Sequence, residues 1–281
     1  MNSNKKTIIY TDLDGTLLDH NTYSFSDALP TLSEVLASRI PVVFCSSKTR
    51  EEIQLLRDQM DVHDPFIIEN GGAVIIPAGY FRVFARSGRA SAEQTIVLGT
   101  PHQVLVEKLA QLQAAFPDTM IGFSQMTVKE VALDCGLQLD DAKRAKQREF
   151  DEPFKLINQD SAMVNRLTDA IRQLGLFCSR GGRYYHLHGH NDKGAAVRLL
   201  NRLFNKAGGE IFTLGVGDSL NDLPMLASVD YPILVRKSAG SYDEDVVKLW
   251  PKVHLADGVG PRGWSKAIKG ILSREAAVES S

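Results

Sequence analysis

The sequence has few cysteines and no long uninterrupted run of apolar residues. The three cysteines, Cys45, Cys135 and Cys178, are odd in number and far apart, which excludes a disulfide framework and a cysteine-rich metal site. No apolar run approaches the length of a membrane span, and the polar start Met1–Lys6 lacks the apolar segment of a signal peptide. We therefore expect a cytoplasmic protein without a membrane partner.

The chain also lacks an excess of charge of either sign. Its 32 basic and 34 acidic residues give a net charge of −2, so there is no electrostatic reason to expect nucleic acid as a partner. With 281 residues, 43% of them hydrophobic, the chain is long enough for one large domain or two ordinary ones with a sizeable core. Its oligomeric state is not indicated.

Short apolar runs typical of strands alternate with helical patterns at both ends of the chain. This alternation predicts an α/β fold with a mostly parallel sheet covered by helices. Thr49 and Glu52 have the spacing of a capping box, and Asp192 is suited to begin another helix. The expected strands are Ile8–Tyr10, Val42–Cys45, Phe66–Ile68, Ile211–Val216 and Tyr231–Val235.

The middle of the chain departs from this alternation and is too long for one strand-to-strand crossover. Residues 86–187 contain two amphipathic helical patterns, so we expect an inserted domain there, between core segments 1–85 and 188–281. The almost wholly charged stretch Asp140–Glu149 predicts a solvated helix, and Ser273–Ser281 a frayed tail.

Two carboxylates, Asp12 and Asp14, follow the first expected strand and precede Gly15. In an extended chain alternate residues point the same way, so the two side chains would share one site at the carboxyl edge of the sheet, where open α/β sheets bind ligands. Like charges so close favour a bound cation, and carboxylate oxygens suit Mg²⁺. The alternative is an acidic turn without a function.

A second acidic segment, Gly215–Asp222, also follows an expected strand. If its strand neighbours the first, Asp218 would join Asp12 and Asp14 around one Mg²⁺. Asp222, together with Ser219, is better placed to orient the ligands. On its own, this segment is equally typical of a turn.

Lys193 and Ser46 lie at two further element ends. A lysine at a helix start is unfavourable for the helix dipole unless an anion shares the site, and Lys193 has that position. Ser46 offers a hydroxyl and a main-chain amide after the second strand. Taken singly, Lys193 is more typical of an exposed surface residue and Ser46 of a turn residue.

The order Asp-x-Asp-Gly-Thr, Ser, Lys and Gly-Asp-x-x-x-Asp resembles the four motifs of the haloacid dehalogenase superfamily. The resemblance implies a Rossmann-like core with an inserted α/β cap domain. It further implies that Asp12 forms an aspartyl-phosphate, that Asp14 is the general acid and base, and that Ser46 and Lys193 bind the phosphoryl oxygens. Mg²⁺ would be held by Asp12, Asp14 and Asp218.

Further strings look like those of mannosyl-3-phosphoglycerate phosphatases. They are Cys45–Thr49, Ile68–Gly72, Arg148–Phe154 and Gly181–His186. This resemblance implies hydrolysis of mannosyl-3-phosphoglycerate, a small anionic substrate. The implied substrate-binding residues are Lys48, Glu69, Asn70, Arg180, Gly181, Gly182, Arg183 and Asn221. Alternatives are an exposed hairpin turn for the arginines and a satisfied loop for Glu69 and Asn70.

Other functions stay open. The runners-up are phosphatases of glucosyl-3-phosphoglycerate or of another sugar phosphate such as sucrose phosphate, then a phosphomutase. A phosphosugar-binding regulator is the alternative from a different class. His186, His188 and His190 alternate as in a strand-borne metal site, but no second Cys or His cluster completes a zinc site.

Overall fold

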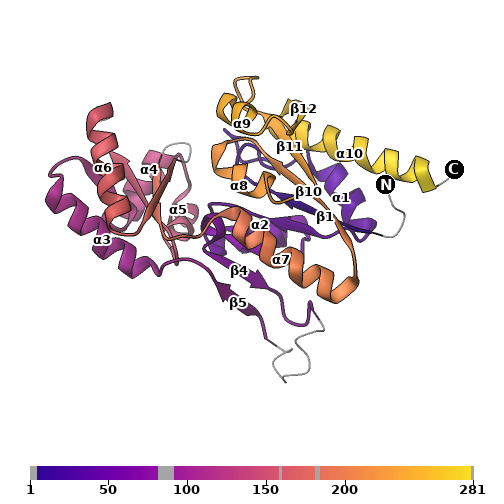
Figure 1. Ribbon diagram of the computed structural model, residues 1–281, viewed down its shortest axis with the longest axis horizontal. Coiled ribbons are helices and arrows are strands. Elements are labelled where there is room, and N and C mark those ends of the chain that lie inside the picture. Colours follow the sequence, from indigo (N-terminus) through magenta and orange to yellow (C-terminus); the bar gives the residue numbers. More distant parts are fainter. Residues whose placement is uncertain (1–4, 82–91, 158–159, 181–183, 280–281) are drawn as a thin grey trace.

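The computed structural model describes residues 5–81, 92–157, 160–180 and 184–279. Figure 1 shows two domains side by side: a core domain that contains both ends of the chain, and a cap domain inserted into it. The cap domain lies between strand β5 (Gln94–Val97) and helix α7 (Lys193–Gly208). The predicted architecture of an α/β core with an inserted α/β cap is confirmed.

The core is built on one parallel sheet. Its five strands follow the order β12-β11-β10-β1-β2, and every neighbouring pair is parallel. Four of them coincide with expected strands, and the edge strand β12 was not predicted. Their bounds are β1 Lys6–Thr11, β2 Val42–Phe44, β10 Ile211–Gly217, β11 Tyr231–Arg236 and β12 His254–Val259.

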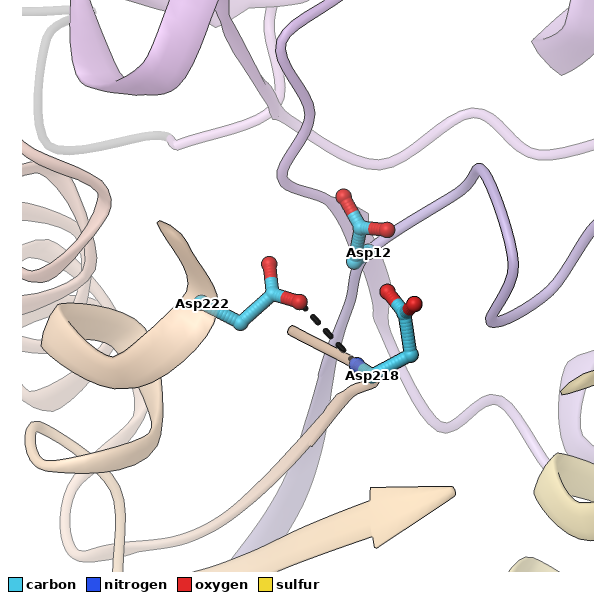
Figure 2. A group of neighbouring side chains, drawn as sticks. All are labelled: Asp12, Asp218 and Asp222. Atoms are coloured by element: carbon cyan, nitrogen blue, oxygen red, sulfur yellow. Dashed lines mark hydrogen bonds between the residues drawn. The ribbon is translucent and has the colours of Figure 1, made fainter. Parts of the chain in front are cut away.

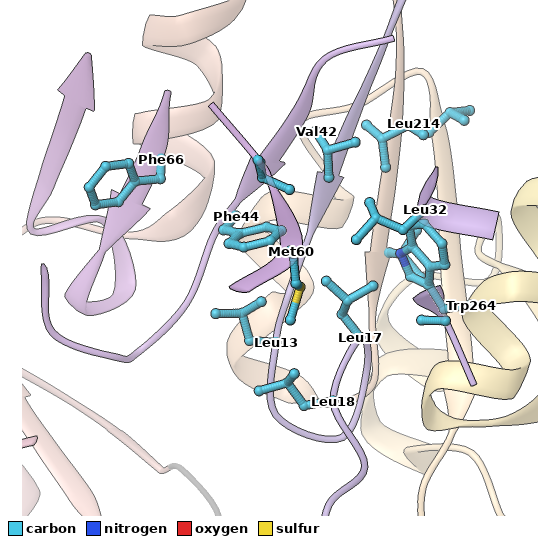
Figure 3. Close-up of a cluster of buried hydrophobic side chains, with 14 of the residues drawn as sticks. Leu13, Leu17, Leu18, Leu32, Val42, Phe44, Met60, Phe66, Leu214 and Trp264 are labelled. Atoms are coloured by element: carbon cyan, nitrogen blue, oxygen red, sulfur yellow. The ribbon is translucent and has the colours of Figure 1, made fainter. Parts of the chain in front are cut away.

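Two apolar layers hold helices against the two faces of this sheet. In β1, Ile9 points into one layer while Ile8 and Tyr10 point into the other, as strand alternation requires. The first layer, drawn in Figure 3, packs side chains of helices α1 (Leu29–Ala37), α2 (Arg50–Met60) and α10 (Gly260–Glu279), including Trp264 of α10, against the sheet. The second layer packs against α7, α8 (Leu223–Leu226) and α9 (Glu244–Leu249).

The predicted helix starts are confirmed by their capping hydrogen bonds. The Thr49 side chain accepts from the Glu52 amide, and the Glu52 carboxylate accepts from the Thr49 amide. At α7 the Asp192 carboxylate accepts from the Ala195 amide at 2.6 Å. These contacts fix where α2 and α7 begin, and both starts border the site described below.

A small antiparallel sheet extends the core beyond the predicted boundary at 86. Strands β3 (Phe66–Ile68), β4 (Ala73–Ile76) and β5 pair in that order, with the 3₁₀ turn η1 (Glu69–Gly71) between β3 and β4. The Gly99 amide then donates to the Gly72 carbonyl at 2.8 Å. Because β5 pairs with a core strand, the structure moves the start of the cap from residue 86 to Thr100.

The cap is a four-stranded antiparallel sheet between two pairs of helices. Its strand order is β6-β7-β9-β8. One apolar cluster packs α3 and α6 on the face far from the core, and a smaller cluster packs α4 and α5 on the other side (Figure 1). The bounds are α3 His102–Ala115, β6 Met120–Gly122, η3 Phe123–Gln125, α4 Val128–Cys135, α5 Leu139–Ala145, β7 Glu152–Leu156, α6 Ser161–Gln173, β8 Phe177–Arg180 and β9 Tyr185–His188.

The charged stretch Asp140–Glu149 is not merely a solvated helix, and this prediction needs correction. Helix α5 ends at Ala145, and the guanidinium of Arg148 donates to the Ser47 carbonyl of the core at 2.7 Å. Glu149 also pairs with a core arginine, Arg50, at 2.9 Å. The end of the charged stretch is therefore part of the contact between the domains.

The predicted frayed tail also differs from the structure. Helix α10 continues through Glu279 and so includes most of Ser273–Ser281. Among the residues that the structure describes, no helix is long and apolar enough to cross a membrane.

Candidate active site

Four functional residues meet because their elements end at one edge of the core sheet. Strands β1 and β10 pair in parallel with Thr11 opposite Val216, so the residues that follow them, Asp12 and Asp218, lie close together. Ser46 follows β2, the other neighbour of β1, and Lys193 is the first residue of α7. Parallel strands thus convert distant sequence positions into one polar cluster.

Three buried aspartates form the centre of this cluster. Oxygens of Asp12, Asp218 and Asp222 lie within 4.8 Å of one another, and Figure 2 shows the three carboxylates converging. Burial, with the charge of Asp222, raises the pKa of Asp12 well above its usual value and that of Asp218 to about 7. A hard divalent cation such as Mg²⁺ would relieve this repulsion, and carboxylate oxygens are its preferred ligands.

Lys193 is the buried counter-charge. Its ammonium lies 2.6 Å from Asp12 Oδ1 and 2.6 Å from Asp222 Oδ1, and the side chain is completely buried. Burial alone opposes the charge, but the two carboxylates outweigh it and raise the pKa of Lys193 above its ordinary value. Lys193 therefore stays an ammonium, fixed beside Asp12.

Asp222 holds the main chain of the second acidic segment. Its Oδ2 accepts from the amides of Asp218 at 3.0 Å, the dashed line in Figure 2, and of Ser219 at 3.1 Å. The Ser219 hydroxyl lies 3.2 Å from Asp218 Oδ1 and 2.7 Å from Asn221 Oδ1. A Cβ at Gly217 would lie 2.6 Å from Asp222 Cβ, so only glycine lets Asp222 come this close.

Asp14 does not join Asp12 as the sequence predicted, and Asp222 completes the group of three aspartates instead. The expectation assumed that the extended chain continues past Asp12, but β1 ends at Thr11 and a turn follows in which Gly15 has φ 81°. The Asp14 carboxylate lies 3.0 Å from the ammonium of Lys48. Its Oδ1 is buried and has no hydrogen-bond partner among the described residues.

Lys48 is held by carboxylates and not left open for a substrate. Besides Asp14, it lies 3.6 Å from Glu52, and its ammonium is 5.1 Å from the centre of the Tyr23 ring. Burial opposes its charge, but these carboxylates raise its pKa above the usual value. A substrate carboxylate would have to share this lysine with Asp14.

Ser46 is buried. The hydroxyl accepts from the Lys48 amide at 3.3 Å. The main-chain amide, which the sequence analysis offered as a second donor, donates instead to the Ile67 carbonyl at 3.1 Å because β3 runs beside this segment. The hydroxyl is thus the group that Ser46 can present to a ligand.

Comparison with known proteins assigns this geometry to a family. Residues 9–96 match the model of haloacid dehalogenase-like hydrolases. The chain is 39% identical to the glucosyl-3-phosphoglycerate/mannosyl-3-phosphoglycerate phosphatase of Methanococcoides burtonii over 270 residues, which cover 96% of this chain and 98% of that protein. The chain belongs to the haloacid dehalogenase-like hydrolases. Within that family this hydrolase is a phosphatase, a phosphoric monoester hydrolase.

Other relatives agree. The hydrolase is 33% identical to the mannosyl-3-phosphoglycerate phosphatase of Pyrococcus furiosus, over 81% of this chain and 90% of that protein. Among solved structures, the sucrose-phosphatase of Synechocystis sp. PCC6803 superimposes with a TM-score of 0.62 at 16% identity, over 95% of this chain and 98% of that one. At this identity the likeness shows the fold alone.

In this hydrolase Glu69 joins the two domains, and both of its carboxylate oxygens already accept main-chain hydrogen bonds. Its carboxylate accepts from the amides of Glu149 at 2.9 Å and Phe150 at 2.8 Å. Burial raises the pKa of Glu69 to about 8, against the opposing charge of Arg148. Of the two alternatives left open by the sequence, the geometry favours the satisfied loop for Glu69.

Asn70, its neighbour, is different. Its main-chain amide donates to the Ser46 carbonyl at 2.9 Å, so the residue borders the cluster. Its side chain is buried, yet the side-chain atoms Oδ1 and Nδ2 have no hydrogen-bond partner among the described residues. The geometry therefore leaves Asn70 available as a substrate-binding residue.

The cap arginines are placed only in part. Arg180 pairs in register with Tyr185 and lies 5.6 Å from its ring, while the next register pair, Ser179 with His186, faces the opposite side of the sheet. Tyr185 packs against the cluster under α3 and α6, so Arg180 lies on the face far from the core. The other predicted members of this segment, Gly181, Gly182 and Arg183, lie outside the described residues.

The three alternating histidines do not form a metal site. His186 Nδ1 lies 2.7 Å from Asp151 Oδ2, and His188 Nδ1 lies 2.9 Å from the Gly189 carbonyl. In the described ranges, the aspartate group of Figure 2 is the one set of three such side chains close enough to share an ion. His186 and His188 belong instead to the internal bonding of the cap and hinge, and the ring of His190 packs against Phe177.

Sequence reasoning missed Asp151 and Asn191. Both are buried, and each has at least one polar atom without a partner among the described residues. Asp151 lies inside the family-like string Arg148–Phe154, and Asn191 lies two residues before Lys193, but neither was predicted to bind a substrate. Their burial was the missing signal, and a sequence does not show burial of an isolated polar residue.

Proposed function

We propose that this phosphatase hydrolyses mannosyl-3-phosphoglycerate to mannosylglycerate and phosphate, with Mg²⁺ and through an aspartyl-phosphate on Asp12. The observation that carries the proposal is the buried group of Asp12, Lys193, Asp218 and Asp222, with Asp14 beside it. The names of the relatives support the substrate. The three cysteines are free, which supports a reducing compartment such as the cytoplasm.

The donor set fits Mg²⁺. Asp12 and Asp218 would hold the ion, since both oxygens of Asp222 already accept hydrogen bonds and the Asp14 carboxylate faces Lys48. When bound, Mg²⁺ neutralises negative charge on the phosphoryl oxygens and on Asp12.

The chain's own residues perform the transfer in two steps. An oxygen of Asp12 attacks phosphorus, and the bond between phosphorus and the glycerate oxygen breaks while Asp14 gives that oxygen a proton. Asp14 then takes a proton from water, whose oxygen attacks phosphorus and releases Asp12 and phosphate. The unpartnered Oδ1 of Asp14 supports this assignment, because it is buried and open to a new hydrogen bond.

Lys193 and Ser46 position the group that is transferred. The Lys193 ammonium is held beside Asp12 by Asp222, so it meets the phosphoryl oxygens without having to rearrange. The Ser46 hydroxyl is available on the neighbouring strand end. Positioning and charge supply most of the rate enhancement in reactions of this class.

A second candidate substrate is glucosyl-3-phosphoglycerate, because the Methanococcoides burtonii relative is named for both compounds. The test is phosphate release by the purified protein with Mg²⁺, comparing the two glycosyl compounds with free 3-phosphoglycerate. Turnover confined to the mannosyl compound supports the proposal, and equal turnover of both broadens it. If neither glycosyl compound releases phosphate, the proposed function is contradicted. Activity that survives chelation of divalent cations contradicts the assigned metal.

A further inference from the structure

Several buried polar atoms between the domains have no partner among the described residues. Both amide atoms of Asn70 and Asn191 and the Oδ1 of Asp151 share this property, with side chains that are 6%, 3% and 0% exposed. Burying a polar group without a hydrogen bond destabilises the folded state. A partner must therefore come from water or from a ligand.

These three residues lie along one path from the catalytic cluster to the cap. Asn191 precedes Lys193 by two residues. The turn that carries Asn70 touches the same segment, since a Cβ at Gly71 would lie 2.2 Å from the Asp192 carbonyl oxygen.

Gly99 joins this segment to the cap. A Cβ placed there would lie 3.2 Å from Asn191 Oδ1 and 2.9 Å from the Cβ of Phe150, whose neighbour is Asp151. The three residues thus form a connected series, which begins two residues before the catalytic lysine and ends directly before β7 of the cap.

The charges on this path suit hydroxyl groups better than anions. The two asparagines are neutral, and each offers a donor and an acceptor. Asp151 is held at Oδ2 by His186, 2.7 Å away; burial opposes ionisation, but His186 and Arg148 outweigh it and lower the pKa of Asp151. An ionised Asp151 accepts hydrogen bonds from hydroxyls and repels a carboxylate or phosphate.

We propose that Asn191 and Asp151, together with Asn70, bind hydroxyl groups of the sugar moiety and so determine which phosphate esters this phosphatase accepts. The inference rests on the proposed function, since it assumes a glycosyl substrate whose phosphate lies at Asp12. His186 is a positioning residue that fixes Asp151 through its Nδ1. Pairs of neighbouring hydroxyls match the donor and acceptor of each amide.

Asn191→Ala is the decisive variant, and Asn201→Ala is its matched control on α7. Asn201 accepts from the Tyr10 hydroxyl at 2.6 Å and donates to the Ser228 carbonyl at 3.3 Å, so its bonds are internal. The ratio of kcat/KM for mannosyl-3-phosphoglycerate to that for p-nitrophenyl phosphate should fall about 10-fold in Asn191→Ala. The control should keep this ratio and lose thermal stability.

Stability distinguishes a binding role from a structural one. Removing an unpartnered amide should leave the melting temperature of Asn191→Ala unchanged or raised, while mannosylglycerate should raise it less than in the wild type. An unchanged selectivity ratio with a lowered melting temperature would overturn the inference, because the amide would then hold a structural water.

Asp151→Asn is a second variant that tests the same site by the same kcat/KM ratio. It keeps an acceptor for His186 but presents a donor or a neutral acceptor to the sugar, so the ratio should fall again, chiefly through KM. An unchanged ratio in both variants overturns the inference while the proposed function stands. A wild type that hydrolyses p-nitrophenyl phosphate but neither glycosyl-3-phosphoglycerate overturns both.

Discussion

In the core, both carboxylate oxygens of Asp222 accept hydrogen bonds, from Lys193 on one side and from two main-chain amides on the other. Between the domains, both amide atoms of Asn191 have no partner among the described residues. Asp222 thus has hydrogen-bond partners on both oxygens before any substrate binds, whereas the Asn191 amide obtains partners only from water or a bound ligand. We therefore expect variants in the core to change turnover and stability, and variants between the domains to change substrate selectivity.

The largest effect is expected at the nucleophile. Asp12→Asn keeps the shape of the side chain but removes the attacking carboxylate, so turnover should fall by at least about 10⁴-fold. Lys193 retains Asp222 as a partner, so the melting temperature should change little. Steady-state phosphate release and a thermal melt check this, and retained activity would place the nucleophile elsewhere.

Asp222→Asn should disrupt the hydrogen bonds that Asp222 accepts from Lys193 and from the amides of Asp218 and Ser219. An asparagine cannot accept at both ends, so its NH₂ group would face either Lys193 or the amides of Asp218 and Ser219. Lys193 would keep Asp12 as its partner, so the cost is that of the donors left without an acceptor, and we expect a loss of about 1–3 kcal/mol in the free energy of unfolding together with reduced turnover. Asp230→Asn is the control, because one oxygen, Oδ2, accepts both of its bonds, from Thr213. Equal losses of unfolding free energy in both variants would contradict the role of Asp222 in holding Lys193 and the main chain of the site.

Glu69, at the contact between the domains, should make the free energy of unfolding depend on pH. Burial raises its pKa to about 8, so the folded state binds a proton more tightly than the unfolded chain. This contribution to stability is fully present below the unfolded pKa of about 4.5 and is lost as the pH rises through about 8.

The measurement is urea unfolding at intervals from pH 5 to pH 9, where Glu69→Gln, a neutral analogue, should flatten the decline. The exposed Glu34→Gln should leave it unchanged. A decline that persists in Glu69→Gln would assign it to other groups.

The smallest effect is expected from Thr49→Ala. Its hydroxyl caps α2 and also donates to the Arg144 carbonyl of the cap domain at 3.0 Å. Loss of the helix cap costs about 1 kcal/mol, and the lost contact between the domains adds to it. Thr127→Ala removes the same kind of capping box within the cap domain alone. Denaturant unfolding should show the greater loss for Thr49→Ala, and equal losses would mean that the Arg144 contact contributes nothing.

Local signals in the sequence were enough to predict the strands and helix starts of the core. The four predicted strands that form its parallel sheet have buried apolar residues at their centres, and the capping box at Thr49 depends on only four residues. The prediction for Asp14 failed because it extended strand geometry beyond Thr11, where the chain already turns. Because of this turn, Asp12 pairs with Lys193 whereas Asp14 pairs with Lys48.

The contacts between the domains were out of reach for a different reason. Glu69 meets amides that are 80 and 81 positions away, and Arg148 meets a carbonyl 101 positions away. No periodicity or spacing encodes such partners. The same holds for the burial of Asn191, which depends on Gly99 and Phe150 coming together.

The two connections between the domains run beside each other. Thr100 on the outgoing connection lies so close to Gly189 on the returning one that a Cβ at Gly189 would be 2.3 Å from the Thr100 hydroxyl oxygen. The chain thus leaves the core and re-enters it at a single point, and the order of the core strands does not depend on what lies between. A change in the length or shape of this segment therefore leaves the connectivity of the reaction centre unchanged.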